Sequence, residues 1–73
     1  MGEKLPSLKS RQVVSALESA GFIQLRQTGS HLHLRKGTLT VTVPMHSRDL
    51  KTGTLRSILR QARMTVDEFR ALL

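Results

Sequence analysis

Apolar residues recur at helical spacing near the start of the chain. The positions that fall on one helix face are Val13, Val14, Leu17 and Ala20. Ser10 is placed to cap this helix, because a serine hydroxyl can accept hydrogen bonds from the free amides of a first turn. Gly21 can end the helix in a left-handed conformation, with Phe22 folding back on the last turn. We therefore expect a helix over residues 11–20, preceded by a flexible arm over residues 1–8.

The pattern then changes to alternation of apolar and polar residues, which is typical of strands with one buried face. Residues 22–28, 31–36 and 38–43 show it, with tight turns expected at Gly29-Ser30 and Lys36-Gly37. The polar positions expected together on the solvent-facing side are Gln24, Arg26, His31, His33, Arg35, Thr38, Thr40 and Thr42. The apolar positions, which alternate with these and face the other side, are Ile23, Leu25, Leu32, Leu34, Leu39, Val41 and Val43. The sequence predicts a three-stranded antiparallel meander, ended by Pro44.

The last third of the chain returns to helical spacing. A polar loop over residues 45–53 leads to a helix over residues 54–62, whose apolar face is formed by Leu55, Ile58 and Leu59. Thr65 and Glu68 have the spacing of a capping box and start a short final helix. The sequence therefore predicts one α+β domain over residues 9–73: a helix, a three-stranded sheet, a helix and a short C-terminal helix.

Charge narrows the class of partner. Twelve Lys and Arg residues oppose five Asp and Glu residues, which gives a net charge of +7 at neutral pH. A polyanion would bind such a chain because neutralised phosphates release condensed counterions, although an acidic protein would respond to the same field. The chain has no Cys, no apolar run near the ~18 residues that span a bilayer, and no signal-like start. We expect a soluble cytoplasmic protein without disulfides or membrane contact.

The ionisable residues suggest RNA chemistry more than metal chemistry. The acids are scattered along the chain, so a magnesium site is not predicted; they are Glu3, Glu18, Asp49, Asp67 and Glu68. RNA carries its own nucleophile, the 2′-hydroxyl, and needs only a general base or acid and cations near the phosphate. Histidine titrates in the required range. His31 follows the Gly29-Ser30 turn on the exposed face, and Arg26 or Arg35 could stabilise charge.

Two other interpretations of the histidines stay open at this point. His31 could be an ordinary surface residue without a catalytic role. Alternatively, His31, His33 and His46 could converge as a three-histidine zinc site, although no carboxylate stands ready to orient them. His33 lies one pleat from His31, about 6.6 Å along the strand.

Four blocks in a fixed order carry a resemblance to a known family. The blocks are Lys9–Phe22, Arg26–His31, Val41–His46 and Leu50–Ala62. Together they resemble the HicA toxins, and the likeness covers all but the first eight residues. The resemblance implies a fold like that of a double-stranded-RNA-binding domain. The family usually carries Gly where this chain has Arg63, so we expect Arg63 to adopt a left-handed conformation at some cost.

The resemblance also implies a function. HicA proteins are mRNA interferases of type II toxin–antitoxin modules, and a HicB antitoxin neutralises them by covering the active-site histidine. That histidine follows Gly-Ser in the family and corresponds to His31. We expect a metal-independent endoribonuclease without cofactors, monomeric when free, that binds mRNA and a HicB-like antitoxin. Gly29 and Ser30 complete the family motif, and His46 matches a frequent family position, so these three are expected to contact RNA. Arg26, His33 and Arg35 are expected to contact RNA from their place on the exposed face. His33 inherits no family role, because many members have a second histidine or an aromatic residue directly after the catalytic histidine, where this chain has Leu32.

Two functions from other classes compete with a toxin. A non-catalytic RNA-binding module could use the same fold, which binds duplex RNA by shape and phosphate contacts. A protein-binding adaptor could use an exposed strand as a docking edge. A His31→Ala variant separates a nuclease from both.

Overall fold

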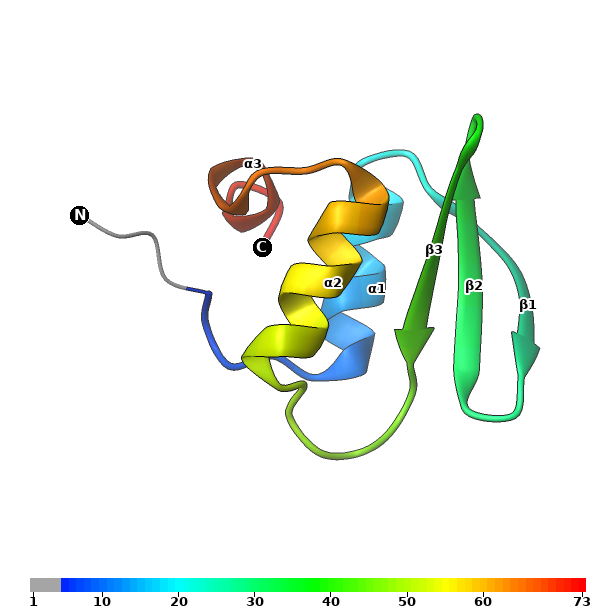
Figure 1. The fold of residues 1–73 in the computed structure, drawn as a ribbon, viewed down its shortest axis with the longest axis horizontal. Coiled ribbons are helices and arrows are strands. Elements are labelled where there is room, and N and C mark those ends of the chain that lie inside the picture. The colour runs from blue at the N-terminus through cyan, green and yellow to red at the C-terminus, as the bar shows by residue number, and fades with distance from the viewer. Residues whose placement is uncertain (1–4) are drawn as a thin grey trace.

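A computed structural model describes residues 5–73 and has the predicted element types in the predicted order. The chain runs through α1 (Ser10–Ser19), β1 (Ile23–Thr28), β2 (His31–Lys36), β3 (Leu39–Pro44), α2 (Thr52–Ala62) and α3 (Val66–Arg70). The strands form one antiparallel sheet in the order β1-β2-β3 (Figure 1). The α+β fold predicted from the sequence is confirmed. No helix in the described part of the chain is long and apolar enough to cross a membrane.

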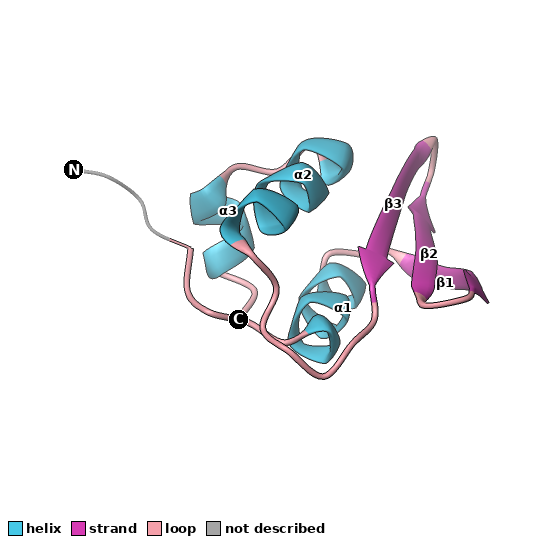
Figure 2. Ribbon diagram, turned by 60° about the horizontal axis from the view of Figure 1, so that its bottom comes forward, coloured by secondary structure: helices cyan, strands magenta, loops and turns pink. Residues whose placement is uncertain are grey.

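The helices lie on one side of the sheet. Figures 1 and 2 show α1 and α2 next to β3, with β1 farthest from the helices. The buried strand residues accordingly come from β2 and β3, namely Leu32, Leu34, Val41 and Val43. The other face of the sheet, here called the outer face, has no helix over it and carries the alternate side chains of each strand. The outer face is therefore the side of the sheet that is open to a ligand.

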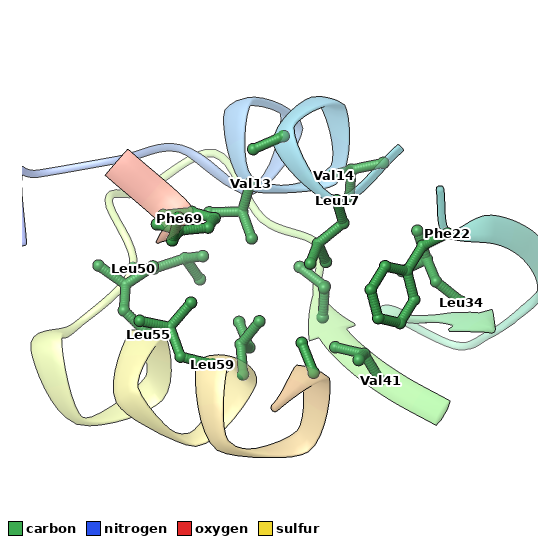
Figure 3. Packing of buried hydrophobic residues seen from close by; sticks show 14 of the residues in the cluster. Val13, Val14, Leu17, Phe22, Leu34, Val41, Leu50, Leu55, Leu59 and Phe69 are labelled. Atoms are coloured by element: carbon green, nitrogen blue, oxygen red, sulfur yellow. The ribbon is translucent and has the colours of Figure 1, made fainter. Parts of the chain in front are cut away.

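One core joins the helices to β2 and β3. Phe69 of α3 is fully buried and lies between Val13 of α1 and the pair Leu50 and Leu55 (Figure 3). The short C-terminal helix thus closes the end of the core that is farthest from the sheet. Burial of one large aromatic ring contributes a substantial share of the apolar area available to so small a domain.

The structure describes residues 5–8 of the expected flexible arm. Residues 1–4 of that arm lie outside the described residues. Leu8, however, is buried at 4 % exposure, and its carbonyl oxygen accepts a 2.8 Å hydrogen bond from Leu50 N–H. Leu8 therefore belongs to the core, and the half-buried Leu5 packs against it, so the core involves residues that the sequence placed in the arm.

The prediction for the two faces of β1 was wrong. The pairing of β1 with β2 shifts between Gln24 and Arg26, as in a β-bulge, so the strand does not alternate regularly along its length. Gln24 is paired with Leu34 on the helix side, where its Nε2 donates a 3.0 Å hydrogen bond to Glu18 of α1. Ile23 is paired with Arg35 instead and is exposed, as is Leu25. Ile23 therefore lies on the outer face, which no helix covers, and Leu25 lies at the register shift, so neither apolar side chain is buried.

The first helix also starts differently from the expectation. Ser10 is the first residue of α1 rather than its cap, and the preceding residue, Lys9, occupies the N-cap position. The backbone N–H of Lys9 donates a 2.8 Å hydrogen bond to Oε1 of Gln12, which satisfies part of the helix start. The Ser10 hydroxyl turns into the protein instead, and the residue is only 2 % exposed.

The remaining helix ends follow the sequence closely. Gly21 has φ +105° and Arg63 has φ +57°, so both ends expected to be left-handed are so. The capping box is present, with Glu68 N–H donating to Thr65 Oγ1 over 3.0 Å and Thr65 N–H donating to the Glu68 carboxylate over 2.8 Å. Helix α2 begins at Thr52, two residues before the expected start.

Candidate functional site

His31 stands at the first position of β2, directly after a tight turn. Gly29 has φ +59°, a conformation that favours glycine, and no heavy atom lies within 4 Å of the place where a Cβ would stand. The turn is held from two sides. Gln27 Nε2 donates a 3.1 Å hydrogen bond to Gly29 O, and Met45 N–H donates a 2.6 Å hydrogen bond to Ser30 O. A fixed, open turn therefore presents the exposed His31 side chain to solvent.

The strand register gathers the predicted site residues on the outer face. His31, His33 and Arg35 alternate along β2, and Arg26 of β1 is the cross-strand partner of His33. Directly paired residues have side chains on the same face, with Cβ atoms about 4.5–5.5 Å apart. The structure thus brings the expected catalytic residue and three of the expected contact residues into one patch, which we call the histidine–arginine patch: Arg26, His31, His33 and Arg35.

The charge on the sheet has one sign. The described strands contain two Arg residues, one Lys and two His residues but no Asp or Glu. Lys36 is turned to the helix side, where its Nζ lies 6.0 Å from the centre of the Phe22 ring. Arg35 bends toward the neighbouring turn, and its Nε donates a 2.7 Å hydrogen bond to Gly37 O, which leaves its terminal nitrogens for other partners. Because no carboxylate neutralises these cations within the sheet, an anion can bind there.

His33 differs from His31 in having a side-chain partner. Thr42 of β3 is its cross-strand partner, and Thr42 Oγ1 lies 3.2 Å from His33 Nδ1. Thr42 is itself held by α2, since its backbone N–H donates a 2.9 Å hydrogen bond to Gln61 Oε1. His33 is half-buried, whereas His31 is exposed. Sequence reasoning missed Thr42, which the alternation placed on the right face but could not place opposite His33.

His46 has a different setting. It follows β3 and lines a groove of about 810 Å³ together with the N-terminal half of α1 and the C-terminal residues Leu72 and Leu73. Its backbone N–H donates a 3.3 Å hydrogen bond to the Ser10 hydroxyl. Among residues 5–73, no three His, Cys, Asp or Glu side chains form a group that could hold a metal ion. His31, His33 and His46 therefore do not converge as the alternative zinc site requires.

Comparison with known proteins gives one result. The sequence model of a family described as the HicA toxin of bacterial toxin–antitoxin systems matches residues 10–64. The matched range starts at the first residue of α1 and includes the whole sheet and α2. A search of curated proteins found no match.

Proposed function

The chain belongs to the HicA toxin family, and we propose that it is the RNA-cleaving toxin of a toxin–antitoxin pair, with His31 as its catalytic side chain. The observation that carries this proposal is the position of His31. It is exposed on the outer face, after an open glycine turn, in a patch with Arg26 and Arg35 and without a carboxylate on the strands.

The substrate that fits this patch is single-stranded RNA. The net charge of +7 favours a polyanion, and the open turn at Gly29 lets a phosphate backbone come close to His31. RNA supplies the nucleophile, because its 2′-hydroxyl can attack the adjacent phosphorus once its proton is removed. His31 is the group that accepts this proton, and the guanidinium groups of Arg26 and Arg35 stabilise the negative charge that develops on the phosphate.

The partner that restrains the toxin follows from the same charge. A HicB-like antitoxin should present acidic residues to the histidine–arginine patch and cover His31. Complementary charge would make the two proteins associate rapidly. The antitoxin thus competes with mRNA for one surface.

The test compares the wild type with His31→Ala. Induced wild-type protein should arrest growth and degrade mRNA, and purified protein should cleave a single-stranded RNA. The His31→Ala variant should be harmless and slower in cleavage by a factor of about 10²–10⁴, the usual contribution of a general acid or base. Circular dichroism and thermal unfolding must show that the variant is folded. Equal growth arrest and equal cleavage by both proteins would refute the catalytic role of His31, and binding without cleavage by the wild type would favour the RNA-binding module.

A further inference from the structure

We infer that His33 is a second catalytic residue, the general acid that protonates the leaving 5′-oxygen, and that Thr42 is its positioning residue. This inference rests on the proposed RNA cleavage at His31. It gives His33 a catalytic role beside His31, where the sequence predicted only a contact with RNA.

The separation of the two histidines suits a reaction at one phosphate. They lie two residues apart on β2, and a strand rises by about 3.3 Å per residue, so their side chains project from points about 6.6 Å apart on the same face. Hydrogen bonds to oxygen are about 2.8 Å long. One phosphate group can therefore stand between the two rings, with its attacking oxygen near His31 and its leaving oxygen near His33.

The Thr42 contact determines which ring atom of His33 can face the substrate. Nδ1 is engaged by the Thr42 hydroxyl at 3.2 Å, so Nε2 is the nitrogen left for RNA. When the imidazole is protonated, Nδ1–H donates to the Thr42 oxygen and Nε2–H is free to donate. The Thr42 hydroxyl oxygen can accept this hydrogen bond. Because Nδ1 keeps its proton when the Nε2 proton is transferred, the hydrogen bond remains and the ring keeps its orientation.

The support for Thr42 extends into the helical layer. Its N–H is bound by Gln61 of α2, and Gln61 Nε2 in turn donates a 3.3 Å hydrogen bond to Ser57 Oγ. Both helix residues are half-buried. His33 is thus held by a chain of contacts that begins in the core layer, which is the arrangement that a positioned catalytic group requires.

The side chains around His33 are all cationic or neutral. Arg26 faces it from β1, His31 and Arg35 flank it on β2, and Thr42 faces it from β3. No carboxylate stands among these neighbours, so none of them holds the imidazolium proton of His33 in an ion pair. The proton on Nε2 therefore has the RNA leaving oxygen as its acceptor.

The step balances as follows. The 2′-hydroxyl proton moves to His31, and a bond forms between the 2′-oxygen and phosphorus. The bond between phosphorus and the 5′-oxygen breaks with its electron pair staying on oxygen, which takes the proton from Nε2 of His33. The products are a 2′,3′-cyclic phosphate and a 5′-hydroxyl end. His31 and His33 then exchange protons with water and return to their starting states.

The experiment uses two substrates that differ in one atom. The first is an oligonucleotide with a single ribonucleotide followed by an ordinary 5′-oxygen. The second has sulfur in place of that oxygen, and the thiolate that leaves needs no protonation. We expect His33→Ala to lower the cleavage rate of the oxygen substrate by about 10²–10⁴ and that of the sulfur substrate by less than about tenfold. His31→Ala should be defective on both substrates.

Variants at position 42 test the positioning role. Thr42→Val removes the hydroxyl at almost constant volume and should slow cleavage of the oxygen substrate by roughly tenfold, the value of one hydrogen bond. Thr42→Ser should recover most of that loss, and the sulfur substrate should be insensitive to both. Thr40→Val makes the same chemical change one pleat away, opposite Arg35, and serves as the control.

The outcomes separate the inference from the proposed function. Equal defects of His33→Ala on both substrates, or no defect on either, would overturn the role of His33 while leaving His31 in place. A folded wild type that cleaves neither substrate would overturn the proposed function, and the inference with it.

Discussion

The Ser10 hydroxyl, in the first turn of α1, donates a 2.6 Å hydrogen bond to the carbonyl oxygen of Pro44, the residue paired with His31. The same hydroxyl accepts from the backbone N–H of His46 at 3.3 Å. One buried side chain therefore ties the helical layer to the end of β3, next to the strand position that carries His31. The position of the proposed catalytic residue depends on the packing between the layers as well as on its own turn.

Removing this hydroxyl should destabilise the domain. In Ser10→Ala, the Pro44 carbonyl and the His46 N–H lose a buried partner, which costs about 1–3 kcal/mol. Chemical denaturation with urea measures the change in the free energy of unfolding. Ser15→Ala is the matched control, because Ser15 is exposed on the same helix, and it should change stability by less than about 0.5 kcal/mol. Equal stabilities of the two variants would mean that the Ser10 contact contributes nothing.

A substitution at Arg63 should stabilise the domain. Arg63 follows α2 with φ +57° and ψ +44°, a conformation that costs a residue with a Cβ about 1–2 kcal/mol. Arg63→Gly removes this conformational cost, but the greater freedom of glycine in the unfolded chain offsets part of the gain in stability. We expect a net stabilisation of roughly 0.5–1 kcal/mol and a melting temperature higher by a few degrees. Arg60→Gly, within the last turn of α2, should instead destabilise by about 1 kcal/mol. A melting temperature that falls in both variants would contradict the strain at Arg63.

RNA cleavage should be independent of added metal. Among the described residues, no three His, Cys, Asp or Glu side chains form a group that could hold a metal ion. The proposed nucleophile belongs to the substrate. Purified protein should therefore cleave single-stranded RNA at the same rate in excess EDTA. DNA of the same sequence should stay intact because it lacks the 2′-hydroxyl. Loss of cleavage in EDTA with recovery on addition of zinc would contradict the proposed mechanism.

Reversing a charge in the histidine–arginine patch should weaken two interactions together. Arg35→Glu places a carboxylate beside His33, so an acidic antitoxin and RNA should both bind at least 100-fold more weakly, in line with the loss of a desolvated charge pair. Arg56→Glu makes the same change in net charge on the exposed side of α2 and is the control. Calorimetry or fluorescence anisotropy at two salt concentrations measures both affinities, and the wild-type values should fall steeply with salt. Unchanged antitoxin affinity in Arg35→Glu would show that the antitoxin acts away from this face.

The order and type of the elements could be predicted from the sequence because they depend on local pattern. Helical spacing of Val13 and Leu17 and alternation through β2 and β3 each report a side of one element that must be buried. The turn before His31 was also local, since Gly29 and Ser30 carry their own conformational preference. The alternation through β2 likewise put His31, His33 and Arg35 on one face.

The tertiary structure decided whatever depends on two segments at once. The pairing of β1 with β2 put Ile23 on the uncovered outer face and left Leu25 exposed at the register shift, although their spacing resembles that of buried residues. Ser10 became a link to Pro44 rather than a cap because β3 ends beside it. Thr42 meets His33 only through the register of β2 and β3. Periodicity records which side of an element is apolar, whereas register, bulges and contacts between layers are set by the pairing of segments distant in the chain.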